Sequence, residues 1–319
     1  MNSSEDLVSI TRNQLEHLQY FQNALNEHGI QYFNAAMIAL SNKPCKFNIY
    51  EYGCTITKNG SVTFYPTHNA GLFSVFSTIM WTILDIITNN DPLPSDINNT
   101  LTMFHFKESQ FTNNYSYYFT SPSTESFSNF VSRAPITLGR YDNRGDYFHV
   151  MQQLGSTWVS NYLKCYMNPT QILEARINFF IFKYNLRSKR SLAVLYRGTD
   201  REIIEDSLNT YIQTCQRKIS ENQIDQVIIQ TEQIQIRERF MSEFDGKCIF
   251  ITELPGTKGD LAMHFEPSFI TDKKLWTLDL IAMTFALAEC HTIVTYTGNI
   301  GLYLSLISQL KGADVIQLR

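Results

Sequence analysis

Residues 192–205 read LAVLYRGTDREIIE, an apolar run that leads directly into an arginine, a glycine and further charged residues. We predict that LAVLY, residues 192–196, is a buried strand and that a helix follows near 202–219. The pattern recurs, with further strands predicted at 226–231, 248–252, 292–296 and 313–318 and helices near 233–244, 273–289 and 299–310. Short apolar runs that alternate with helices indicate a parallel sheet covered on both faces. We therefore expect a Rossmann-like α/β domain after residue 190.

The N-terminal part of the chain is less regular, and we also expect it to be α/β. Its predicted elements are an amphipathic helix over 5–28, a hairpin over 47–66 that turns at Asn59-Gly60, and helices over 71–87, 147–165 and 169–186. In the last of these helices, Asn168 is the expected cap and Pro169 the first helical residue. We place the boundary between an N-terminal domain, 1–187, and a C-terminal domain, 188–319.

Composition limits the class of protein. The 319 residues are 44% hydrophobic and 18% charged, and they carry a net charge of −4, which argues against bulk attraction to nucleic acid. No uncharged apolar run reaches about 18 residues, so we expect no membrane span. The six cysteines are scattered without a C-x-x-C pair and the N-terminus lacks the pattern of a signal peptide. We therefore expect reduced thiols and a cytoplasmic location.

The first predicted strand end carries Arg197, Gly198 and Asp200. Ligands of open parallel sheets bind outside the carboxyl ends of the strands. An arginine at such an end presents a permanently charged fork that suits a phosphate, and a glycine lets the backbone approach the ligand closely. A purely structural alternative is that Asp200 caps the following helix while Arg197 pairs with a carboxylate.

Two later strand ends carry polar residues of the same kind. Glu232 follows the strand at 226–231, where such domains often read a ribose hydroxyl or a base edge. Thr297, Gly298 and Asn299 stand between the strand at 292–296 and the next helix, and they can form a neutral cradle for an anion. Simple helix capping explains either segment equally well. The sequence has no H-E-x-x-H or D-x-D metal motif, so we expect no metal site.

The order of these motifs resembles the fucosyltransferase superfamily, closest in style to the α1,6-fucosyltransferases and the nodulation-factor enzymes, with the protein O-fucosyltransferases more distant. The resemblance implies an α/β fold of the GT-B-like type, two Rossmann-like domains with a ligand cleft between them. The N-terminal domain would take the acceptor and the C-terminal domain the nucleotide sugar. Arg197 matches the arginine that contacts the diphosphate of GDP-fucose, Asp200 matches an aspartate of the same motif, and Arg201 stands where a lysine is usual. Glu205 falls at the spacing of the proposed general base.

The resemblance extends to other donor-binding positions. Glu232 matches the first of two carboxylates, Asp279 a nucleotide-contacting aspartate, and Thr297 or Gly298 a small phosphate-contacting residue. Two further candidates lie in loops, since Gly71 could face the crevice and His264 could contact donor or acceptor. For His264, an ordinary surface-loop position is an equal alternative.

The sequence also departs from the superfamily pattern, because Gly198 replaces a second arginine and Gln233 replaces a second aspartate. The resemblance implies a metal-independent enzyme without a cofactor that transfers fucose from GDP-fucose to a glycan or protein acceptor with inversion. The departures leave two alternatives open. One is a glycosyltransferase that uses another GDP- or UDP-sugar, and the other is a non-catalytic nucleotide- or carbohydrate-binding relative.

Overall fold

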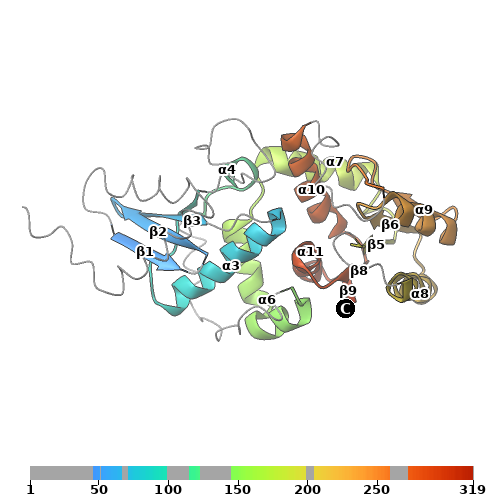
Figure 1. Ribbon diagram of the computed structural model, residues 1–319, viewed down its shortest axis with the longest axis horizontal. Helices are drawn as coiled ribbons and strands as arrows, with labels where there is room; N and C mark the ends of the chain where they lie inside the picture. The colour runs from blue at the N-terminus through green and yellow to red at the C-terminus, as the bar shows by residue number, and fades with distance from the viewer. Residues whose placement is uncertain are drawn as a thin grey trace, which may run out of the picture.

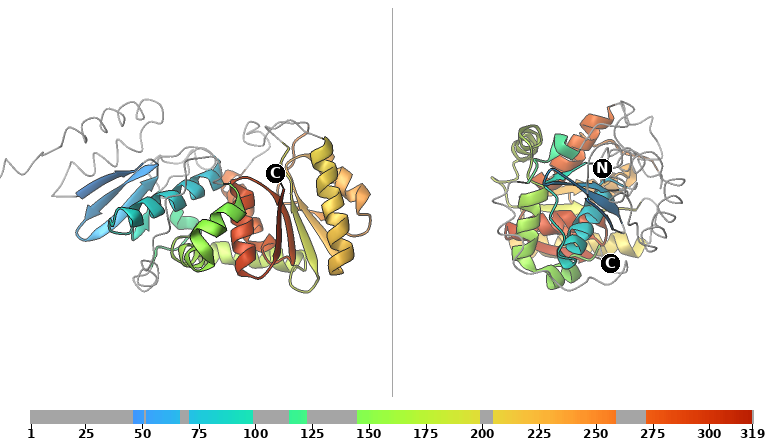
Figure 2. Two further views of the ribbon diagram at one scale, coloured as in Figure 1. Left: turned by 90° about the horizontal axis from the view of Figure 1, so that it is seen from below. Right: turned by 90° about the vertical axis from the view of Figure 1, so that its left-hand side faces the viewer.

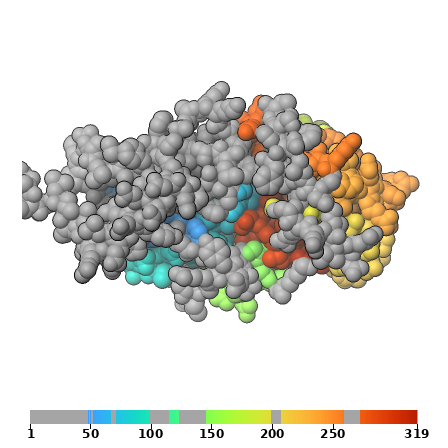
Figure 3. All heavy atoms as spheres, in the orientation of Figure 1, coloured from blue at the N-terminus to red at the C-terminus, as the bar shows by residue number. Residues whose placement is uncertain are grey.

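The computed structural model describes residues 46–50, 52–66, 71–98, 115–122, 145–198, 205–258 and 272–318. The molecule is elongated, with one β-sheet toward each end and a layer of helices between them (Figure 1). Figure 3 shows the residues around α9 at the end that is opposite to the N-terminal sheet. Among the helices in these ranges, none is both long and apolar enough to cross a membrane.

The C-terminal sheet has five parallel strands in the order β7-β6-β5-β8-β9. Their bounds are β5 Ser191–Leu195, β6 Gln226–Gln230, β7 Cys248–Phe250, β8 Thr292–Tyr296 and β9 Asp314–Leu318. Every residue of the three central strands is buried, which is why these segments read as short, mostly apolar runs. The predicted parallel sheet is confirmed.

Four helices connect these strands: α8 Glu205–Asn222, α9 Ile234–Glu243, α10 Lys273–Leu287 and α11 Asn299–Leu310. Helices α8 and α9 cover one face of the sheet, and α10 and α11 cover the other (Figure 2). This strand order and two-sided cover are those of a doubly wound α/β domain. The α/β fold class expected from the sequence is therefore confirmed.

The N-terminal sheet is smaller and mixed. Strands β1 Lys46–Tyr50, β2 Gly53–Lys58 and β3 Ser61–Pro66 are antiparallel, and β4 Asp96–Ile97 pairs parallel to β3. Asn59 and Gly60 both have positive φ, 51° and 80°, as the predicted two-residue hairpin turn requires. Helix α3 Leu72–Thr88 connects β3 to β4. The helix predicted over 5–28 lies outside the described residues.

Between the two sheets, the described ranges also contain the helices α4 Tyr115–Tyr118, α6 Tyr147–Tyr166 and α7 Gln171–Lys183. Helix α6 kinks at Gly155, whose φ of 75° is readily adopted only by glycine. The cap predicted for α7 was wrong. Thr170 is the cap and its hydroxyl accepts from the backbone N–H of Leu173, while Pro169 precedes the helix in a bridge with Phe119.

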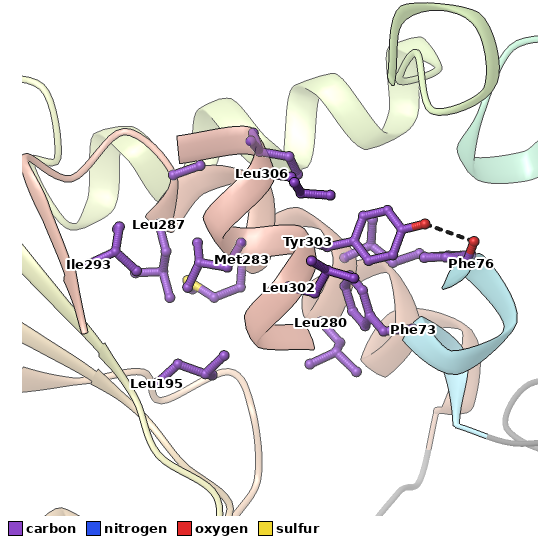
Figure 4. Packing of buried hydrophobic residues seen from close by; sticks show 14 of the residues in the cluster. Phe73, Phe76, Leu195, Leu280, Met283, Leu287, Ile293, Leu302, Tyr303 and Leu306 are labelled. Carbon is purple, nitrogen blue, oxygen red and sulfur yellow. Dashed lines mark hydrogen bonds between the residues drawn. The ribbon is translucent and has the colours of Figure 1, made fainter. Parts of the chain in front are cut away.

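A single hydrophobic core runs through the described parts of both sheets. Side chains of α10 and α11 pack on the parallel sheet, and α11 also packs against α3 (Figure 4). There the Tyr303 hydroxyl donates to the backbone oxygen of Phe76 at 2.7 Å, and the ring of Tyr303 lies 5.8 Å from that of Phe73. The two helices assigned by sequence to the N-terminal domain, α6 and α7, pack against α11 and α10. The boundary after residue 187 stays a prediction.

Candidate nucleotide site at the strand ends

The carboxyl edge of the parallel sheet brings together the three segments that the sequence singled out. In the β5–β6 register Leu195 lies opposite Gln230, and in the β5–β8 register Val194 lies opposite Val294. The residues that follow these strands, Arg197, Glu232 and Thr297, therefore leave the sheet at the same edge. Because the strand order changes direction between β5 and β8, this is also the switch point at which α/β sheets bind ligands.

A small pocket opens at this edge. Its enclosed volume is about 30 Å³, and it is lined by Leu195, Tyr196, Arg197, Gly198, Gln230, Thr231, Glu232, Tyr296 and Ile300. Its charged lining residues are one cation, Arg197, and one anion, Glu232. Both side chains belong to half-buried residues. The mouth of the pocket therefore offers one positive and one hydrogen-bond-accepting group to a ligand that carries negative charge beside hydroxyl groups.

Tyr196 fixes the direction in which the chain leaves β5. Its backbone N–H donates to the Gln230 oxygen at 3.1 Å, which extends the β5–β6 pairing by one residue. Its buried ring packs edge-on against Tyr211 of α8, with 5.1 Å between ring centroids. Arg197 is thus the first residue of this segment beyond the sheet and stands at the pocket rim.

The glycine after this arginine is explained by Gln233. A Cβ atom on Gly198 would lie 2.3 Å from the Oε1 atom of Gln233 and 3.1 Å from a ring carbon of Tyr196. Gln233 is fully buried, so a shift of its side chain has to be accommodated inside the packed interior. The two departures from the superfamily pattern are therefore physically linked: glutamine at 233 fills the space that any side chain at 198 needs.

The first turn of α11 supplies donors at the same edge. Gly298 is the N-cap residue and makes no side-chain cap hydrogen bond. The first backbone bond within the helix runs from the Leu302 N–H to the Gly298 oxygen at 2.7 Å. The N–H groups of Asn299, Ile300 and Gly301 therefore have no carbonyl partner within the helix, and such groups favour an anion.

Arg237 is a residue at this edge that sequence analysis missed. From α9 its guanidinium donates to the backbone oxygens of Thr231, Leu254 and Pro255 at 2.7 to 3.1 Å. Burial lowers the pKa of Arg237, and the nearby Glu232 carboxylate opposes that shift. The arginine thus joins the segments that follow β6 and β7 and holds Glu232 beside the pocket.

Gln317 is a second missed residue, and it holds the loop after β8. Its amide nitrogen donates to the backbone oxygens of Gly145 and Tyr296, at 2.8 and 3.1 Å, and its oxygen accepts from the Tyr147 N–H at 2.7 Å. A Cβ on Gly145 would lie 3.0 Å from the backbone of Gly298. The segment before α6 is therefore packed directly onto the first turn of α11.

The structure places Asp279 away from this pocket. It lies on α10, where its oxygens accept from the Arg176 Nε and terminal nitrogen at 2.5 and 3.0 Å. Its side chain is only 4% exposed, and burial raises its pKa although Arg176 acts in the opposite direction. Asp279 does not line the pocket, so the observed contact is an ion pair that joins α10 to α7.

Several predicted site residues cannot be compared in this way. Asp200, Arg201 and His264 lie outside the described residues. Glu205 is the first residue of α8, and the structure describes its backbone only. Gly71 is exposed at the N-cap of α3 and does not line the pocket.

No metal-binding group of three His, Cys, Asp or Glu side chains is found in the described ranges. The five cysteines in these ranges are free and buried: Cys54, Cys165, Cys215, Cys248 and Cys290. Burial raises the pKa of Cys54, Cys215 and Cys248 to about 12, so these thiols stay protonated at neutral pH.

The sequence matches no protein-family model and no curated protein. Among solved structures, the chain is similar to a variant of Arabidopsis thaliana FUT1 in complex with GDP. That alignment covers 97% of this chain and 79% of the other, with 9% sequence identity and a TM-score of 0.41.

Proposed function

We propose that the chain is a glycosyltransferase that binds a nucleotide sugar at the carboxyl edge of its parallel sheet. The observation that carries this proposal is the pocket at the switch point of the sheet, whose lining includes Arg197 and Glu232 from two separately predicted segments and Ile300, which directly follows the third. A pocket that rested on one segment alone would fit simple helix capping equally well. The positive charge of Arg197 and the N–H groups of the first turn of α11 lie at the same edge of the sheet, and both suit a diphosphate.

In this proposal the positive groups act on the leaving group. Arg197 and the N–H groups at the start of α11 stabilise the negative charge that develops on the departing nucleoside diphosphate. Glu232 accepts a hydrogen bond from a hydroxyl or base edge of the nucleotide. These interactions supply the charge that a metal ion supplies in other transferases, and the proposed reaction is therefore metal-independent.

The proposed donor is GDP-fucose, because the order of the strand-end motifs resembles the fucosyltransferases. Glu205 is the proposed general base that takes the proton from an acceptor hydroxyl as the sugar is transferred with inversion. The acceptor is a glycan or a protein hydroxyl. Two alternatives follow from Gly198 and Gln233: a different GDP- or UDP-sugar, or binding without turnover.

A thermal-shift panel with GDP, UDP and their sugars tests the binding step. A ligand that binds the folded protein raises its Tm by an amount that grows with concentration. We expect GDP and GDP-fucose to raise the Tm, and Arg197→Ala to remove that shift. Arg217→Ala is the matched control, because Arg217 is a 56% exposed arginine on α8 whose partner is Glu221.

The panel also separates the alternatives. A shift with UDP-sugars instead of GDP-sugars indicates a UDP-sugar donor. A shift with no hydrolysis or transfer, either with a chelator or with added divalent metal, indicates a non-catalytic binder. Absence of any shift with all nucleotides contradicts the proposed function.

A further inference from the structure

Helix α7 carries an exposed apolar stripe that is separate from the pocket. The stripe consists of Ile172, Ala175, Phe179 and Phe182, which we call the α7 seam. Phe182 is 84% exposed, Ile172 48% and Phe179 42%. An exposed cluster with two phenylalanines is unusual on a helix of a soluble protein and marks an interaction surface.

The seam lies on the side of α7 that faces away from the core. The helix buries Leu173, Ile177, Phe180 and Ile181 against the rest of the protein. At 100° per residue these positions centre on one face, and the α7 seam centres roughly 160° to 200° away. A helix that is apolar on two opposite faces is typically buried on both. The second face therefore lacks its partner in the single chain.

We propose that the α7 seam is the contact of a homodimer in which two copies of α7 pack antiparallel across a two-fold axis. The spacing of the seam, 172, 175, 179 and 182, is the three-four spacing of a coiled-coil seam. In the antiparallel pair, Ile172 lies opposite Phe182 and Ala175 opposite Phe179. The small Ala175 then leaves room for Phe179, and Ile172 packs on Phe182, so one surface is complementary to itself.

The flanking charges permit this approach. Arg176 is paired with Asp279 at 2.5 Å, and Lys183 is paired with Glu253 at 2.5 Å. Both cations beside the seam are therefore neutralised within their own chain. On the other side the flanking residues are the uncharged Gln171 and Asn178. Two copies can therefore meet without repulsion between like charges.

The size of the surface predicts the strength of the dimer. Aromatic side chains bury roughly 150–250 Å² each, so the exposed fractions of the seam amount to about 350 Å² per copy. Helix α10, which packs against α7, carries one more exposed apolar side chain, Leu275, at 46%. Figure 1 shows α7 and α10 next to each other. Stable complexes bury about 800 Å² per partner, so we expect a weak, reversible dimer with a Kd in the micromolar range.

Sedimentation velocity of the full chain between about 1 and 200 µM tests this inference. We expect the weight-average mass to rise with concentration from 36.9 kDa toward twice that value. Phe182→Lys should hold the protein at the monomer mass. Phe148→Lys is the matched control, since Phe148 is a 54% exposed phenylalanine on α6, and it should behave like the wild type.

A pair of exchanged residues tests the antiparallel arrangement itself. Ala175→Phe should weaken the dimer at least tenfold because it meets Phe179 of the second copy, and adding Phe179→Ala should restore it. Circular dichroism and Tm verify that each variant is folded. A wild type that stays monomeric over the whole range overturns the proposal. So does a dimer that survives Phe182→Lys or is lost with Phe148→Lys.

Discussion

Replacing Gly198 with alanine tests the link between the pocket rim and the buried glutamine behind it. The new Cβ would lie 2.3 Å from Gln233 Oε1, about 1 Å short of ordinary contact. Overpacking of this kind typically costs about 1–3 kcal/mol of unfolding free energy. The smaller entropy of the unfolded alanine chain offsets about 0.4–1 kcal/mol. We expect Gly198→Ala to lower the free energy of unfolding by about 1–2 kcal/mol.

A double-mutant cycle with Gln233→Ala isolates the cause. Removing the Gln233 side chain takes away two of the three closest atoms, at 2.3 and 3.2 Å, and the ring carbon of Tyr196 at 3.1 Å is the remaining close contact. Gly198→Ala should therefore be nearly neutral in the Gln233→Ala background, which gives a coupling energy of about 1–2 kcal/mol. Urea unfolding followed by tryptophan fluorescence measures all four proteins.

The reasoning fails if Gly198→Ala is as stable as the wild type. It also fails if the substitution costs the same in both backgrounds, because the glutamine is then not what excludes a side chain at 198. The clash would also displace the backbone next to Arg197. Binding of a nucleotide should therefore weaken in the single variant and recover in part in the double variant.

Three further predictions concern the supports of the site and the core. Arg176→Ala should lower the unfolding free energy measured in urea by about 3–5 kcal/mol, because it leaves the buried Asp279 without its partner. The double variant Arg176→Met with Asp279→Leu should recover most of that loss, and equal stability of the single and double variants would contradict this. Gln317→Glu should cost at least about 2 kcal/mol, since a carboxylate oxygen would face two carbonyl oxygens; an unchanged urea midpoint would refute it. At pH 8 only about 1 in 10⁴ of the thiols with a pKa of about 12 is ionised, so mass spectrometry should find Cys54, Cys215 and Cys248 unalkylated until the protein unfolds.

The parallel sheet was predictable because its central strands are buried on both faces. A strand such as β6, Gln226–Gln230, is buried along its whole length and reads as an apolar run between two glutamines. The start of α7 was mispredicted because its geometry depends on Phe119, 50 residues away, which bridges to Pro169. No local pattern around Asn168 contains that contact.

The candidate site likewise has residues that could be predicted from the sequence and residues that could not. Arg197 and Glu232 directly follow strand ends, so strand prediction was enough to bring them together, whereas Ile300, just after the predicted segment 297–299, was not among the predicted site residues. Arg237 and Gln317 bind backbone oxygens that come from several separate segments, and a sequence does not reveal where those oxygens converge. Gln317 did leave one signal, as a polar residue inside an otherwise apolar strand. The ion pair of Asp279 with Arg176 left none, because its partner lies on another helix.

The central claim is that the strand-end pocket binds a nucleoside diphosphate through Arg197. Calorimetric titration of GDP into the wild type, Arg197→Ala and the Arg217→Ala control tests it most directly. A hydrogen bond to a charged group contributes about 1.5–3 kcal/mol, so Arg197→Ala should weaken binding about 10- to 150-fold while the control matches the wild type. Equal GDP affinity in the Arg197→Ala variant and the wild type, or no heat of binding in any of the three proteins, would contradict the account.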